Sequence, residues 1–177
     1  MVMPNQNRTK RLTVCAMLCA LGVVILLLGS FITVMDLSMA VIASLLCVVA
    51  VIEYGGAWPW MIYAGTSVLS LVLIPNKEVA ALYAIFFGFY PIIKEKLEKR
   101  SRVFAWVCKE IIFLAALVAC FAAWKIFFPQ ELTISIPIPL WVVLILVLEL
   151  VFVLYDVALT RLISFYVYRL RHRFRFF

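Results

Sequence analysis

The feature that most constrains the fold is an uncharged run of 23 residues, from residue 12 to residue 34. A helix that crosses the apolar core of a bilayer needs about 20 mostly apolar residues, so a run of this length is typical of a transmembrane helix. The whole chain is 67% hydrophobic and has a mean hydropathy of +1.15. Soluble domains contain roughly 45–50% apolar residues, so an ordinary water-soluble fold is excluded.

Five more apolar segments follow the first, and they are separated by short polar or glycine-containing breaks. We therefore predict an all-α, polytopic membrane protein, a bundle of six transmembrane helices in a single domain. The third span begins beside Pro59, which suits the first turn of a helix. The predicted spans cover approximately residues 12–34, 37–52, 58–74, 79–93, 103–124 and 140–165, and a basic tail occupies residues 169–177.

The distribution of lysine and arginine predicts the orientation of the bundle. Three of these residues precede the first span, five lie between residues 94 and 102, and five lie from residue 161 onward. On the opposite side there are only Lys77 and Lys125, and Lys109 lies within the fifth span. Thirteen against two is a strong positive-inside signal, which predicts a cell-membrane protein with both termini in the cytoplasm. The net charge of +7 thus reflects membrane topology and predicts no nucleic-acid partner.

The sequence offers no catalytic, metal-binding or cofactor motif. Its five cysteines lie in apolar runs without a CxxC pair, which favours a packing role over metal ligation. The single histidine, His172, is in the basic tail, so an intramembrane Ser-His dyad is excluded. We therefore predict that the protein is not an enzyme and has no catalytic residue, no metal and no cofactor.

Charged residues inside apolar spans are costly, and they indicate either function or specific packing. Lys109 in the fifth span and Asp156 in the sixth lie at comparable depths, and we predict that they form an intramembrane charge pair. Such a pair could take part in transport, or it could be a static pair that fixes the packing of two helices. Glu149 lies near the bilayer midplane without an evident partner, so it is either protonated or faces a polar cavity.

The outer half of the bundle contains aromatic and polar residues suited to a small-molecule pocket. These predicted substrate-binding residues are Ser70, Asn76, Tyr83, Trp141 and Glu149. Each of them could instead be an interfacial anchor. These residues do not indicate which substrate would bind.

Small residues recur at helical spacing, which allows close helix approach in lipid. Ala80, Ala84 and Gly88 form such a ridge in the fourth span, where packing within the bundle is the simpler interpretation. Ala16 and Ala20 lie near the cytoplasmic end of the first span, where another subunit could dock.

A short basic N-terminus followed by A-x-x-x-A on the first of six helices resembles the S components of energy-coupling factor (ECF) transporters. The resemblance implies that Ala16 and Ala20 contact a transmembrane coupling subunit. It also implies two cytoplasmic ATPases as partners, and a ligand such as a vitamin, a vitamin precursor or a metal ion, taken up from outside.

A second family is similar in size and number of spans, namely the MreD-like proteins that determine rod shape. A scaffold of this kind transports nothing and needs no ligand cavity. Its intramembrane polar residues would lie at interfaces with partner proteins. The sequence leaves both functions open.

Overall fold

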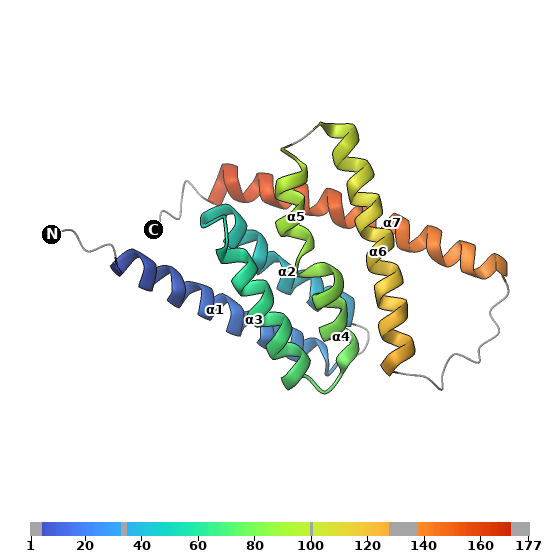
Figure 1. Cartoon of the computed structure of the whole chain (residues 1–177), viewed down its shortest axis with the longest axis horizontal. Helices are drawn as coiled ribbons and strands as arrows, with labels where there is room; N and C mark the ends of the chain where they lie inside the picture. Colours follow the sequence, from blue (N-terminus) through green and yellow to red (C-terminus); the bar gives the residue numbers. More distant parts are fainter. Residues whose placement is uncertain (1–4, 33–34, 100, 128–137, 171–177) are drawn as a thin grey trace. The chain divides into compact units, whose positions relative to one another are not determined.

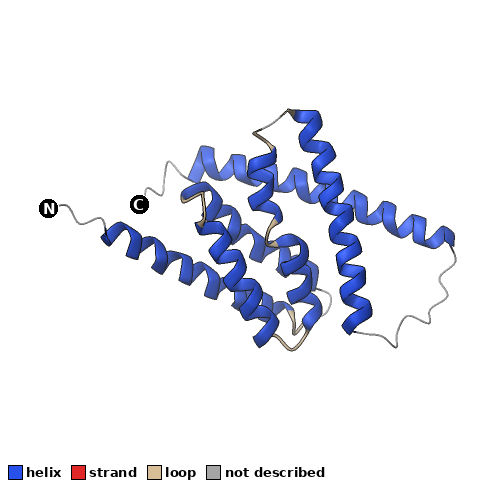
Figure 2. Ribbon diagram, viewed as in Figure 1, coloured by secondary structure: helices blue, strands red, loops and turns tan. Residues whose placement is uncertain are grey.

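The computed structural model describes residues 5–32, 35–99, 101–127 and 138–170. These residues are almost entirely helical and include no strand (Figure 2). They belong to two compact units, Met1–Phe121 and Ala122–Phe177, and each unit is described by itself. The predicted all-α fold is confirmed for this part of the chain.

Four of the described helical stretches are long and apolar enough to cross a membrane. They are Arg8–Gly29, Asp36–Glu53, Val103–Ala123 and Val143–Tyr168. They correspond to the first, second, fifth and sixth predicted spans, as expected of a membrane protein. The third predicted span is an apolar helix of 16 residues, and it begins with Pro59 in its first turn, as predicted.

The first unit is built on helices α1 (Asn5–Gly29), α2 (Asp36–Glu53) and α3 (Trp58–Leu73), and α1 packs along both of the others (Figure 1). Cysteine and glycine make this close approach possible. A Cβ atom on Gly22 would lie 3.1 Å from Thr66 of α3, and one on Gly65 would lie 2.9 Å from the sulfur of Cys19. Small residues thus form the α1–α3 contact, as they do between many membrane helices.

The fourth predicted span is not one α-helix, which corrects the expected helix over residues 79–93. It consists of α4 (Lys77–Leu82), the π-helix η2 (Tyr83–Phe87) and α5 (Tyr90–Leu97). Pro91 explains the break, because it has no N–H to donate to the carbonyl of Phe87 and its ring would clash with that carbonyl. The chain widens into a π-turn instead, and the N–H of Gly88 donates to the carbonyl of Tyr83 at 2.8 Å.

Two further boundaries differ from the prediction. Helix α5 continues to Leu97, so Lys94 and Lys96 belong to its last turn and not to a loop. Helix α1 begins at Asn5, before the apolar run, and ends at Gly29. In both cases the helix extends through polar residues that a hydropathy window assigns to connections.

The fifth and sixth predicted spans are α6 (Arg102–Phe127) and α7 (Ile138–Phe165). Most of α6 belongs to the first unit, while α7 and the π-helix η3 (Tyr166–Leu170) belong to the second. The expected connection after residue 125 lies mostly outside the described residues, and so does nearly all of the predicted basic tail, residues 169–177.

Candidate functional site

Two contacts between cations and aromatic rings define one end of the first unit. The guanidinium of Arg11 lies 5.9 Å from the ring centre of Tyr54, and the ammonium of Lys96 lies 5.8 Å from that of Trp60. These contacts bring together the start of α1, the end of α2, the start of α3 and the end of α5. We call this the basic end, because it carries the described cations Arg8, Lys10, Arg11, Lys94, Lys96 and Lys99.

The opposite end of the first unit contains Asn76, one of the predicted pocket residues. Its amide oxygen accepts from the N–H of Glu78 at 3.1 Å and so caps α4, as asparagine commonly does. Its amide nitrogen donates to Asp36 at 3.4 Å. The neighbouring Lys77 donates to the carbonyls of Leu71 and Ile74, which end α3. Asn76 therefore has a structural role in joining helix ends.

Ser70 and Tyr83, also predicted to line the pocket, are buried in the first unit. The Ser70 hydroxyl donates to the carbonyl of Ser67 at 3.0 Å, a bond within its own helix. The Tyr83 hydroxyl lies 3.2 Å from the sulfur of Cys47 on α2. Both side chains thus already have an intramolecular partner.

The other two predicted pocket residues, Trp141 and Glu149, lie on α7 in the second unit, and both are half-buried. A pocket that joins them to Ser70, Asn76 and Tyr83 stays a prediction.

Tyr63 of α3 supplies a hydrogen bond to the irregular backbone of η2. The sequence interpretation did not identify this residue. The Tyr63 hydroxyl donates to the carbonyl of Ala84 at 2.8 Å. Gly88 makes room for the tyrosine ring, since a Cβ atom there would lie 2.6 Å from Tyr63 and 2.9 Å from Tyr83. Such compensation is needed in a membrane protein, because lipid offers no hydrogen bonds to an unpaired carbonyl.

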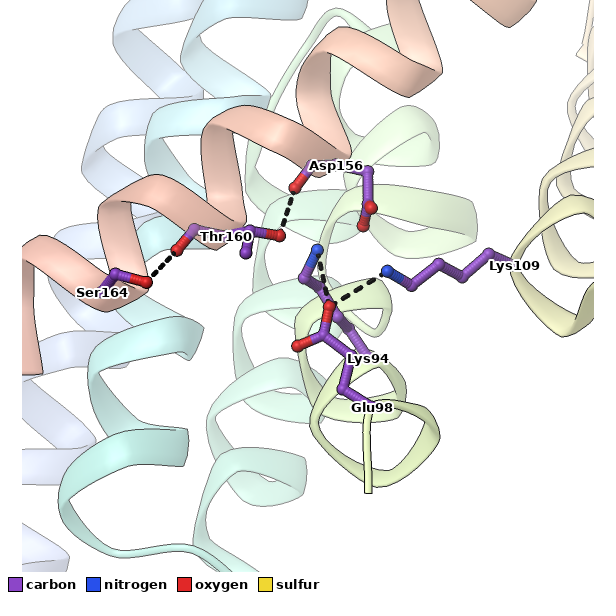
Figure 3. Close-up of polar contacts among 6 residues, drawn as sticks. All are labelled: Lys94, Glu98, Lys109, Asp156, Thr160 and Ser164. Carbon is purple, nitrogen blue, oxygen red and sulfur yellow. Dashed lines mark hydrogen bonds and ion pairs between the residues drawn. The ribbon is translucent and has the colours of Figure 1, made fainter. Parts of the chain in front are cut away.

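At the basic end, one carboxylate serves two buried lysines, as Figure 3 shows. The same oxygen of Glu98 lies 3.2 Å from the ammonium of Lys94 and 3.0 Å from that of Lys109. Lys94 is 0% exposed and Lys109 is 5% exposed, so pairing is essential to offset the desolvation of their charges. The sequence interpretation placed Lys94 and Glu98 in the loop between the fourth and fifth spans and therefore missed this cluster.

Asp156, the predicted partner of Lys109, is on α7 in the second unit. Its backbone carbonyl accepts from the Thr160 hydroxyl at 2.8 Å, and the carbonyl of Thr160 accepts from Ser164 at 2.9 Å (Figure 3). The partner that the structure assigns to Lys109 within the first unit is Glu98. The pair between Lys109 and Asp156 stays a prediction.

The predicted partner-coupling residues, Ala16 and Ala20, are both exposed on α1. The small residues that pack α1 against its neighbours lie on another face of the helix. This inner face comprises Cys15, Cys19, Gly22, Leu26 and Gly29, at the three-and-four spacing of a helix seam.

The chemistry that these side chains offer is ionic and hydrogen-bonding. No group of three or more His, Cys, Asp or Glu side chains in the described parts of the chain is arranged to hold a metal ion. The five cysteines are free thiols, and Cys15 and Cys47 are buried.

The described residues form an all-helical chain that includes four helices long and apolar enough to cross a membrane. Comparison of the chain with family models, with curated proteins and with solved structures finds no match.

Proposed function

We propose that this chain is a six-span cell-membrane protein that binds a small, vitamin-like molecule for uptake. In this proposal it resembles an S component and works with a coupling transmembrane subunit and ATPases. The observation that carries the proposal is the division of α1 into two faces. Its inner face is filled by α2 and α3, whereas Ala16 and Ala20 remain exposed, and such small side chains allow close approach of a partner helix.

The distribution of charge supports the proposed orientation, with both termini in the cytoplasm. Basic residues from the start of α1 and the end of α5 lie at one end of the first unit, although they are far apart in the sequence. The opposite end has Lys77 with the acidic residues Asp36 and Glu78. By the positive-inside rule, this arrangement supports a cytoplasmic location of the basic end.

The proposal counts the segment Lys77–Leu97 as one interrupted span. Its 21 residues would extend about 31 Å as a helix, close to the roughly 30 Å of a bilayer core. Broken helices occur in membranes where neighbouring helices satisfy the freed backbone groups, as Tyr63 does here.

The test of the proposal is affinity capture of the full-length chain, with partners identified by mass spectrometry. The unaltered protein should retain a membrane coupling subunit and P-loop ATPases, and Ala16→Trp with Ala20→Trp should abolish their capture. Ala64→Trp, at an exposed alanine of α3, is the matched control and should leave capture intact. The proposal fails if no ATPase copurifies with the unaltered chain, or if the control loses its partners equally.

A second candidate is the non-transporting, MreD-like scaffold. It is favoured by the internal bonds of Ser70, Asn76 and Tyr83, since side chains occupied in this way are not free to line a ligand pocket. A scaffold should copurify with membrane proteins of cell-wall synthesis and without ATPases. Loss of rod shape on depletion of the protein would favour this function over uptake.

A further inference from the structure

The basic end of the first unit carries exposed cations that the proposed function uses only for orientation in the membrane. Arg8, Lys10 and Arg11 are exposed on the first turns of α1, and Lys96 is exposed on α5. The ion pairs seen among the described residues join other lysines to Glu95 and Glu98 and include none of these four. Their charges are therefore directed toward the surroundings of the protein.

Two of these cations lie over aromatic rings on either side of the turn between α2 and α3. Arg11 lies over Tyr54, just before the turn, and Lys96 lies over Trp60, just after it. Burial raises the pKa of Tyr54 above its ordinary value, so this ring is neutral at physiological pH. A neutral ring orients a cation without cancelling its charge.

The remaining acidic group at this turn is Glu53, the last residue of α2. Arg11 and Lys96 lie at this turn, and with Arg8 and Lys10 in the same first turns of α1 the four cations exceed this carboxylate by three charges. Tyrosine and tryptophan at helix ends mark the level of the lipid headgroups. The excess positive charge thus lies at the depth of membrane phosphates.

An apolar strip continues from these cations along α1. Met17, Leu21, Val24 and Leu28 are 67%, 49%, 51% and 53% exposed, and their three-and-four spacing puts them on one face of α1 below the charged first turns. A ligand that matches both features must have an anionic head and an apolar chain. A free phosphate would satisfy only the first of them.

We propose that the basic end binds an anionic phospholipid. Its phosphate contacts the cations that flank the turn between α2 and α3, and its acyl chains lie against the exposed strip of α1. Attraction of this kind between clustered basic residues and anionic headgroups is well established for membrane surfaces.

The test is a native mass spectrometry titration of the full-length protein in detergent with dioctanoyl phosphatidylglycerol, compared with dioctanoyl phosphatidylcholine. The anionic lipid should bind preferentially, and Arg11→Gln with Lys96→Gln should weaken its binding roughly tenfold or more. Lys77→Gln with Lys125→Gln is the control with equal charge loss, at the two lysines predicted for the opposite side of the membrane, and it should bind like the unaltered chain.

Three outcomes would overturn the proposal. Equal binding of the two lipids would show that charge is not recognised, and equal loss in both double variants would show that only net charge matters. Binding of glycerol 3-phosphate as tight as that of the lipid would show that the acyl chains contribute nothing. The unaltered protein can also be titrated at high ionic strength. Screening of the charges should then remove its preference for the anionic lipid.

Discussion

Helix α1 and the segment Lys77–Leu97 pack against their neighbours in the first unit in different ways. Helix α1 is continuous for 25 residues and approaches its neighbours closely at small residues such as Gly22. The segment Lys77–Leu97 is interrupted by η2, and its backbone is completed by Tyr63 from another helix. The first solution depends on leaving space and the second on supplying one hydrogen bond, so they should respond differently to substitution.

The largest effect is expected for Gly88→Val, at the interrupted segment. The new Cβ would lie 2.6 Å from the ring of Tyr63 and 2.9 Å from that of Tyr83, so the half-buried Tyr63 and the buried Tyr83 would both have to move. Overpacking of this kind costs about 3 kcal/mol in stability. Reversible unfolding in mixed detergent micelles measures the loss. Ala64→Val, at an exposed position of α3, is the control and should change stability by less than about 0.5 kcal/mol.

Tyr63→Phe tests the hydrogen bond itself while it keeps the ring in place. It removes the donor to the carbonyl of Ala84, and the expected loss is about 1–2 kcal/mol, because that carbonyl is left without this partner. The amides of Ala84–Phe89 should also exchange with deuterium faster than in the unaltered protein, whereas those of α1 should not change. Unchanged stability and exchange would mean that η2 does not depend on Tyr63.

The existence and extent of the long helices are predictable from the sequence because hydropathy over 20 residues is a strong local signal. The interruption of the fourth span is harder to predict from the sequence. Pro91 is visible in the sequence, but the response to it depends on a hydroxyl 28 residues earlier, which only the packed structure brings to Ala84. A window centred on apolar residues cannot identify such a partner.

The ion-pair partners of the buried lysines are also hard to predict from the sequence. Lys94 and Glu98 belong to a charge run that is predicted to be a loop, yet α5 continues to Leu97 and Lys94 is buried in its last turn. Lys109 was predicted as an intramembrane charge, and the structure adds Glu98 as a partner. Charge spacing in the sequence identifies residues that need partners, whereas the choice of partner is a property of packing between helices.

Gly22→Ala gives a smaller effect at the continuous helix. The added methyl would lie 3.1 Å from Thr66, which is tight but requires a shift of only a few tenths of an ångström. Alanine is also a better helix former than glycine by about 1 kcal/mol, so the clash and the propensity largely offset one another. We expect a net loss of about 1 kcal/mol or less in micelle unfolding. A loss as large as that of Gly88→Val would show that α1 is packed as rigidly as the interrupted segment.

The smallest effect is expected for Ala16→Leu with Ala20→Leu, on the exposed side of α1. Neither residue is buried by α2 or α3, and leucine and alanine both favour helix, so stability in micelles should change by less than about 0.5 kcal/mol. The same double variant should weaken capture of the proposed coupling subunit, because the larger side chains prevent close approach of a partner helix. Unchanged stability with lost capture would assign this face to a partner. A loss of stability close to that of Gly88→Val would show instead that Ala16 and Ala20 pack within the protein, and that α1 has no free face.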